Sequence, residues 1–290
     1  MDWYFFALIS LFSAGFQRFL LKVSVEKQYS VKLVSVWLTL TVAVLSMVFF
    51  IISSETFVIS QILIVLSLVY GLSFVGLTFF RLVALRYLPT VIFYPLLQIA
   101  VVFVVLFSVL YLHESLTLYQ GLGMLLVPIS VILLKKQYPG DWVHFPHINK
   151  GFVLLLLTIF CAIFFWGVPK LATLHISQHY LFMMLAFWCA TFMSLMVPHR
   201  LLRTESNSPV VCQLKYKQII MGVGIGILFF ISISTYLTAL ILGPLSIVSV
   251  IYSFSSVIVV LLSVVVYKEI VTLRRVMGIV VTLFALFLFY

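Results

Sequence analysis

Two pairs of segments decide the fold: residues 84–89 (ALRYLP) and 114–123 (ESLTLYQGLG) recur as residues 239–244 (ALILGP) and 269–278 (EIVTLRRVMG). Both pairs have the same offset of 155 residues (269 − 114), without a gap. The matched positions include Pro89 with Pro244 and Glu114 with Glu269, and Pro and Glu are rare letters in this apolar chain. Shared composition therefore does not explain the match, which indicates that an ancestral helical unit was duplicated.

The composition is that of a membrane protein. The chain is 64% hydrophobic and 8% charged, with a mean hydropathy of +1.30, which a lipid-facing helix bundle requires and a soluble core of this size does not. The formal net charge of +10 is typical of loops that follow the positive-inside rule, and we expect no nucleic-acid partner. The three cysteines lie in apolar runs or in a basic loop, so no disulfide framework is expected.

Apolar runs of roughly 20 residues, the length that a bilayer core demands of a helix, recur along the chain. The expected spans are 3–21, 33–53, 61–85, 90–112, 116–135, 151–171, 180–198, 217–241, 246–267 and 271–289. We therefore predict an all-α polytopic membrane protein with ten transmembrane helices in two five-helix repeats. The first repeat covers 1–137 and the second 151–290, with a cytoplasmic linker at 138–150. Five spans per repeat invert the second copy, and inverted repeats are common in secondary transporters.

The basic residues sort onto one side of this topology. The loops on that side, and the span ends beside them, hold Lys22, Lys27, Lys32, Arg81, Arg86, Lys135, Lys136, Lys150, Arg200, Arg203, Lys215, Lys217, Lys268, Arg274 and Arg275. Lys170 is the one basic residue near the other side. The positive-inside rule makes the basic side cytoplasmic and both termini extracytoplasmic. The expected location is the plasma (inner) membrane.

Three short motifs carry a family resemblance. Glu114-Ser-Leu-Thr117 and Glu269-Ile-Val-Thr272 each open the last span of a repeat, and Phe165-Trp166-Gly167 lies in the first span of the second repeat. Together with the repeat they resemble the drug/metabolite transporter superfamily, specifically its ten-helix EamA-type branch. The resemblance implies an integral transporter with its substrate path between the repeats and spans five and ten at the periphery. Family members commonly have cytoplasmic termini, so the loop charges predict a reversed orientation here.

Matched polar stripes mark spans four and nine. Span four places Tyr94 and Gln98 on one helical face, and the copy in span nine places Ser249 and Ser253 on the corresponding face. One interpretation is close helix packing through small and hydroxyl side chains. The other is the lining of a solute cavity near the bilayer midplane.

Further candidates for substrate binding are the polar pair Gln17 and Arg18 in span one. Polar groups on a membrane helix are costly unless they face protein or water. A long arginine side chain can alternatively snorkel to the cytoplasmic surface, an interpretation that also applies to Arg81 in span three. Lys170 is a candidate outer gate or counter-ion for an anionic solute, or a lone interfacial lysine.

Aromatic residues complete the candidate site. Trp166 and Tyr236 offer ring faces on which a solute could stack, although interfacial anchoring or core packing is the alternative for either residue. Gly222 and Gly226 form a pair that favours close helix packing.

The carboxylates suggest structural roles. Glu114 and Glu269 stand at span boundaries, where each can cap the helix that follows it by accepting free N–H groups. The middles of the expected spans contain no Asp or Glu, which argues against proton-coupled export of cationic drugs. The sequence shows no metal-ligand cluster and no catalytic motif, so we expect neither an enzyme nor a cofactor.

The sequence therefore predicts a secondary transporter or facilitator of a small polar metabolite, with amino-acid-like or other neutral or zwitterionic solutes preferred. Its partners would be that solute and the lipid bilayer, and a homodimer is compatible with the sequence. The alternative is a membrane scaffold or lipid-binding protein without transport activity.

Overall fold

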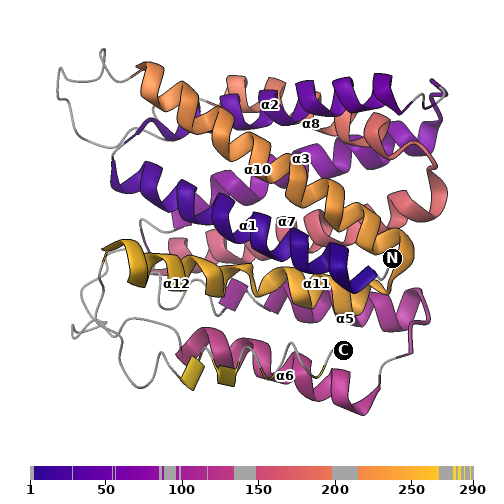
Figure 1. Ribbon diagram of the computed structural model, residues 1–290, viewed down its shortest axis with the longest axis vertical. Helices are drawn as coiled ribbons and strands as arrows, with labels where there is room; N and C mark the ends of the chain where they lie inside the picture. Colours follow the sequence, from indigo (N-terminus) through magenta and orange to yellow (C-terminus); the bar gives the residue numbers. More distant parts are fainter. Residues whose placement is uncertain are drawn as a thin grey trace.

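The computed structural model is a bundle of α-helices (Figure 1). It describes residues 3–27, 29–53, 55, 57–84, 87, 96–97, 99–115, 117–133, 148–197 and 215–267, and six single positions between 277 and 288. Every element within these ranges is an α-helix, as the sequence predicted. The helices are α1 (Trp3–Glu26), α2 (Val31–Ile52), α3 (Gln61–Ala84), α5 (Ile99–Tyr111), α6 (Leu118–Leu133), α7 (Ile148–His175), α8 (His179–Met196), α10 (Lys215–Leu242), α11 (Leu245–Ser253) and α12 (Ser255–Tyr267).

Six of these helices, α1, α2, α3, α7, α8 and α10, are long and apolar enough to cross a membrane. Two shorter apolar segments, Ile99–Tyr111 and Leu245–Val259, fall within the expected fourth and ninth spans. Large apolar side chains are exposed along the helices, as in Ile51 (66%) and Phe160 (59%), which suits a surface that faces lipid. Most of the expected tenth span and the start of the fourth lie outside the described residues.

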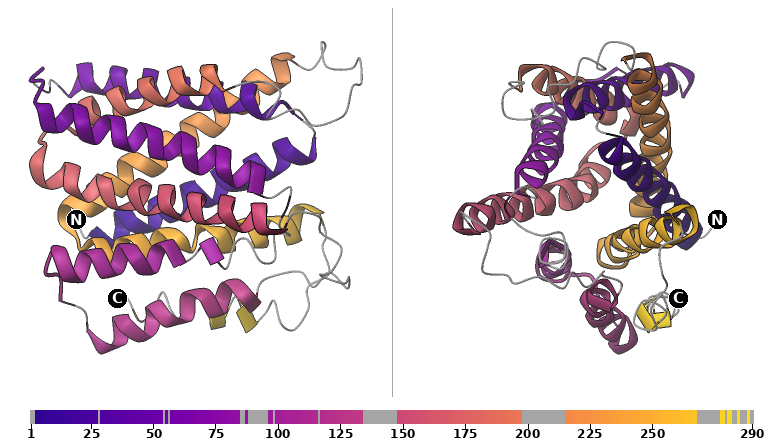
Figure 2. Two further views of the ribbon diagram at one scale, coloured as in Figure 1. Left: turned by 180° about the vertical axis from the view of Figure 1, so that it is seen from behind. Right: turned by 90° about the vertical axis from the view of Figure 1, so that its left-hand side faces the viewer.

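The helices run side by side, so their connections gather at two ends of the bundle (Figure 1). One end, which we call the hairpin end, holds the connections α2–α3, α5–α6, α7–α8 and α10–α11. The opposite end, which we call the basic end, holds the start of α7 and α10 and the end of α1 and α3. The α6 helix lies at one margin of the bundle (Figure 2).

Helices of the first half of the chain pack on helices of the second half. The α1 helix packs on α10 and α7 packs on α3, while α2 packs on α10 and α8 on α3. Reciprocal hydrogen bonds fasten the first pair, because the Ser10 hydroxyl donates to the Ser232 carbonyl at 2.8 Å and the Ser232 hydroxyl donates to the Ser10 carbonyl at 3.1 Å. The α2 and α8 helices meet each other between these pairs.

Two glycines allow the closest helix contacts. A Cβ on Gly226 of α10 would lie 2.6 Å from the Thr41 Cβ and 2.9 Å from the Leu38 carbonyl oxygen of α2. A Cβ on Gly71 of α3 would clash with the Ala186 carbonyl oxygen of α8. Small residues at these positions let the backbones approach, so the packing role expected for Gly226 agrees with the structure.

The expected single span 246–267 is divided at Phe254 into α11 and α12. The Phe254 N–H bonds to the Ile251 carbonyl, and the Val257 N–H bonds to the Phe254 carbonyl, so the helix tightens to three-residue steps at this point. The Ser253 and Ser255 hydroxyls donate to carbonyls three residues earlier, at 2.7 and 2.6 Å. Serine bonds of this kind compete with the helix and bend it, which an apolar run does not reveal.

Candidate functional site

A cluster of polar and aromatic side chains lies inside the bundle where α1, α7, α10 and α11 meet. The Tyr236 hydroxyl of α10 donates to the Trp166 carbonyl of α7 at 3.2 Å. The Tyr236 and Tyr252 rings are 4.9 Å apart, and Tyr252 belongs to α11. The Arg18 guanidinium carbon of α1 lies 5.3 Å from the centre of the Tyr252 ring. We call Arg18, Trp166, Tyr236 and Tyr252 the central cluster, in which the observed contact of Trp166 is made by its main-chain carbonyl.

Arg18 points into the bundle and does not snorkel toward the basic end. Gly15, one turn before Arg18, faces Ile258 of α12. The Arg18 guanidinium lies over Tyr252, which precedes Ile258 by six residues and is therefore nearer the start of α11. The side chain therefore reaches back toward the bundle interior, as the tilt of helical side chains toward the N-terminus favours. Within the described residues no carboxylate forms an ion pair with this guanidinium.

Trp166 carries a hydrogen-bond donor that has no partner among the described residues. The side chain is only 6% exposed, and its Nε1–H is buried. A buried N–H without a partner costs about 1–3 kcal/mol, so its persistence in an otherwise packed interior marks a place where a bound molecule can accept a hydrogen bond. Gln17, next to Arg18, is also buried, at 6% exposure.

Several other predicted residues lie outside the central cluster or outside the described part of the chain. The Ser249 and Ser253 hydroxyls donate to carbonyls of their own helix, at 3.1 and 2.7 Å, so their protons serve the backbone and not a solute. Arg81 lies in the last turn of α3, at the basic end and outside the central cluster. Four candidates lie outside the described residues: Tyr94, Gln98, Pro89 and Glu269.

Glu114 caps a helix, but a different one from the helix that the sequence suggested. We expected it to cap the helix that follows it, α6, whereas its carboxylate accepts the N–H groups of Leu245 at 2.7 Å and Ser246 at 3.0 Å, at the start of α11. The Ser246 hydroxyl donates to the same carboxylate at 2.8 Å, and so does the Ser108 hydroxyl of α5. The loop places Glu114 against a distant helix, which sequence spacing does not show.

Lys170 also binds the connection between α10 and α11. Its Nζ donates to the Leu240 carbonyl at 2.7 Å and to the Gly243 carbonyl at 2.8 Å, at the C-terminal end of α10. A cation is favourable there because it meets the negative end of the helix dipole. The contacts give Lys170 a helix-capping role at the end of α10, which neither interpretation made from the sequence includes.

A second carboxylate, Glu55, has a matching role that the sequence analysis missed. It lies between α2 and α3 and accepts the N–H groups of Tyr180 at 3.3 Å and Leu181 at 3.2 Å, at the start of α8. A carboxylate in a short connection of an acid-poor chain was the available signal.

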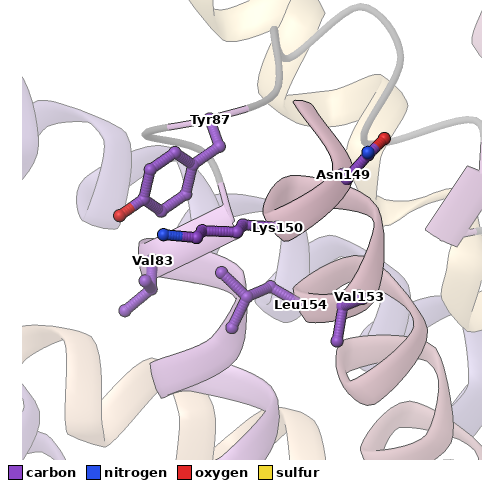
Figure 3. Close-up of a pocket in the computed structure, with 6 residues that line it drawn as sticks. All are labelled: Val83, Tyr87, Asn149, Lys150, Val153 and Leu154. Carbon is purple, nitrogen blue, oxygen red and sulfur yellow. The ribbon is translucent and has the colours of Figure 1, made fainter. Parts of the chain in front are cut away.

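An open pocket of about 440 Å³ lies at the basic end, between the end of α3 and the start of α7 (Figure 3). Its lining includes Tyr87, Asn149 and Lys150 beside apolar side chains, and Lys150 extends toward Tyr87. None of the residues predicted to bind the solute lines it. We place the candidate site at the central cluster, because the charge and the unused donor lie there and the pocket opens at the bundle surface.

The fold is that of a polytopic helical membrane protein, with six helices long and apolar enough to cross a membrane among the described residues. The chain belongs to the EamA-like transporter family, whose model matches residues 1–135 and 153–290. The resemblance inferred from the repeat motifs is thereby confirmed. Membership makes the protein a membrane transporter of the drug/metabolite type, which agrees with the expectation that it is not an enzyme.

Solved structures show the same fold. Twenty-eight chains match, and one of them, described as "Crystal structure of protein", has a TM-score of 0.70 at 15% identity, with 97% of this chain and 95% of the other covered. At that identity the likeness shows the fold alone. None of the curated proteins compared matches this chain.

Proposed function

We propose that the protein is a secondary transporter of a small polar metabolite, with amino-acid-like and other zwitterionic solutes preferred. The observation that carries the proposal is the Arg18 guanidinium, which lies over Tyr252 inside the bundle without an ion-pair partner among the described residues. A charge on a membrane helix is costly, and a solute carboxylate would offset that cost. The Trp166 Nε1–H would donate to the same solute, and the Tyr236 and Tyr252 rings would cover it.

The transport mechanism we propose is alternating access between two inverted five-helix repeats. Support comes from residues that the 155-residue offset relates. Phe74 and Phe229 differ by this offset, and their rings stack at 5.2 Å, as expected for equivalent residues beside a two-fold axis. Gly71 and Gly226 also differ by it, and they pack on α8 and α2, which are equivalent helices. The two segments matched by the family model have limits close to those of the proposed repeats.

The expected contribution of span four belongs to the same proposal. Tyr94 and Gln98 of the first repeat remain proposed solute-binding residues, and α5, which continues their span, packs on both α7 and α11. The solute path would then be lined from both repeats, as in transporters that bind at the repeat interface.

The orientation we propose places the basic end in the cytoplasm and both termini outside, in the plasma (inner) membrane. Lys22, Lys27, Lys32, Lys150 and Lys217 lie in or beside the helix ends that meet at the basic end. This asymmetry supports the orientation because positive charge is retained in cytoplasmic loops.

Two assays test the proposal: a thermal-shift screen on the purified protein, and solute flux after reconstitution in proteoliposomes. A thermal-shift screen over amino acids and related zwitterions should find a stabilising solute, since a ligand at 100 times its Kd stabilises the folded state by about 2.7 kcal/mol. That solute should also exchange across the liposome membrane. Arg18→Gln should abolish both effects, whereas Lys217→Gln, a charge-matched change at an exposed position of the basic end, should preserve them. Absence of flux and of stabilisation for every solute would favour the scaffold alternative.

A further inference from the structure

The connection between α10 and α11 is held from two sides. Glu114 accepts the first N–H groups of α11, and Lys170 donates to the last carbonyls of α10. The two charged groups also attract each other. The Trp3 ring packs on Gly243 between them, because a Cβ on that glycine would lie 2.8 Å from the ring. We call the contacts of Glu114 and Lys170 with residues 240–246 the hairpin clamp.

The start of α11 depends on this remote carboxylate. Its N-cap residue, Pro244, forms no side-chain cap, so the acceptors for Leu245 and Ser246 come from Glu114 in the first half of the chain. A contact that joins the two halves must break when they separate at this end. Leu245 and Ser246 are fully buried here, so their freed N–H groups need water that enters from the hairpin end as the two halves separate.

The α11 helix is built as a short separate segment. It extends only from Leu245 to Ser253, between the clamp and the break at Phe254. Tyr252 lies seven residues after Leu245, or about 10 Å along the helix at 1.5 Å per residue. The segment therefore covers the central cluster from the hairpin end, with one end held by Glu114 and the other at a bend.

We propose that α11 is the gate at the hairpin end, that it hinges at Phe254, and that Glu114 latches it shut. This inference rests on the proposed transport function. In the latched state α11 is buried from Leu245 to Ser253, and Tyr252 is only 4% exposed. Release of Leu245 and Ser246 from Glu114 lets α11 swing and opens the central cluster to this end.

The groups around Glu114 set its charge. Lys170 faces it from α7, Tyr236 from α10, Ser246 from α11 and Ser108 from α5, and His113 precedes it in the chain. Burial alone would raise the pKa of Glu114, but the hydrogen bonds from Ser108, Ser246 and Leu245 outweigh burial and lower it. Glu114 is therefore ionised at neutral pH and serves as a latch and not as a proton carrier. The contribution of the latch is fully present above the ordinary carboxyl pKa and is lost as the pH falls through the lowered value.

A cysteine behind the gate reports its opening without any solute. Ser249 is 2% exposed and lies one turn inside the clamp on α11. The test introduces Ser249→Cys in a background in which Cys161, Cys189 and Cys212 are changed to Ala. The protein is reconstituted in liposomes and labelled from the hairpin side with a charged pyridyl disulfide. This reagent also reacts with thiols in acid. Ser53→Cys, at an exposed position of the same end, normalises the rate.

Glu114→Gln should raise the normalised labelling rate by about tenfold or more, because it removes hydrogen bonds to a charged group and sets an NH₂ donor against the N–H donors of α11. Glu55→Gln is the matched control, since Glu55 caps α8 at the same end and does not touch α11; labelling should stay at the parent rate. The parent protein should label faster in acid, and Glu114→Gln should lack this dependence. Equal labelling in both variants, or a parent rate that does not change with pH, would overturn the gate.

The two proposals fail in different ways. Labelling that rises in Glu114→Gln while no solute crosses the liposome membrane would keep the gate and reject the transport function. Solute flux together with unchanged labelling would keep transport and reject α11 as the gate. The pH arm needs no change at Glu114, so the test remains decisive if Glu114→Gln does not fold.

Discussion

His113 shows how a single backbone conformation places a functional side chain. It ends α5 with a φ of 53°, in the left-handed region, and the Leu112 and Glu114 N–H groups both bond to the Ser108 carbonyl. Such a cap reverses the chain after a helix. The reversal turns Glu114 back toward Ser108 and the start of α11. Histidine tolerates this region better than β-branched residues do.

His113→Val should therefore destabilise the protein, and His113→Gly should not. The left-handed conformation costs about 1–2 kcal/mol for a residue with a Cβ, and a β-branched side chain increases that cost. Thermal melts in detergent should show a lower Tm for His113→Val and an unchanged or higher Tm for His113→Gly. A Tm for His113→Val equal to the parent value would contradict the role of this cap.

At this scale, the sequence predicted part of the candidate site that the structure brings together. Arg18, Trp166 and Tyr236 were candidates because a polar or aromatic side chain in an apolar span can contact a solute inside the bundle. Tyr252 was not predicted. The serine residues on the same span were predicted to line the site, but the Ser249 and Ser253 hydroxyls bond to carbonyls of their own helix. The helix that Glu114 caps could not be predicted, because its partner comes from residues more than 100 positions away.

Trp166→Phe should weaken solute binding. The change removes the Nε1–H, which has no partner in the part of the chain that the structure describes, so the stabilisation conferred by the bound solute should fall by about 1 kcal/mol, the typical value of one hydrogen bond. Trp188→Phe provides the control, because Trp188 is 44% exposed and lies outside the cluster. Equal ligand-induced thermal shifts in both variants would remove Trp166 from the site.

At the scale of helices, apolar run length predicted the elements well. The expected limits of spans two, three, seven and eight lie within a few residues of α2, α3, α8 and α10. The length of a hydrophobic run predicts the length of a helix but not whether the helix is continuous. The break at Phe254 was therefore not predicted. The break depends on serine hydroxyls that bond backward, and this choice of partner is made only in the folded structure.

Gly226→Ala should loosen the contact between α10 and α2. The new methyl group would lie 2.6 Å from the Thr41 Cβ and 2.9 Å from a backbone oxygen, and overpacking of this kind costs about 1–3 kcal/mol. Gly224→Ala is the control on the same helix, because nothing lies within 4 Å of its Cβ position. It should raise stability slightly through better helix propensity. Thermal melts of the two variants should move in opposite directions.

At the scale of the whole molecule, the duplicated sequence and the charge distribution describe one architecture. Rings related by the repeat stack on each other at Phe74 and Phe229, and the helices of each half pack on those of the other. Inversion would place equivalent ends of the repeats on opposite sides of the membrane, where selection for positive charge differs. The clamp residue Lys170, at the hairpin end, donates hydrogen bonds to two carbonyls at the end of α10.

Labelling in intact cells tests the orientation. Ser53→Cys lies at the hairpin end and Tyr216→Cys at the basic end, and both positions are exposed on the surface of the bundle. In the background without native cysteines, an impermeant thiol reagent should label Ser53→Cys from outside and Tyr216→Cys only after permeabilisation. Neither change alters a basic residue, so the charge asymmetry that sets the topology is kept. The reverse pattern would place the hairpin clamp in the cytoplasm: α11 would then gate the inner side, and the positive-inside rule would fail for this chain.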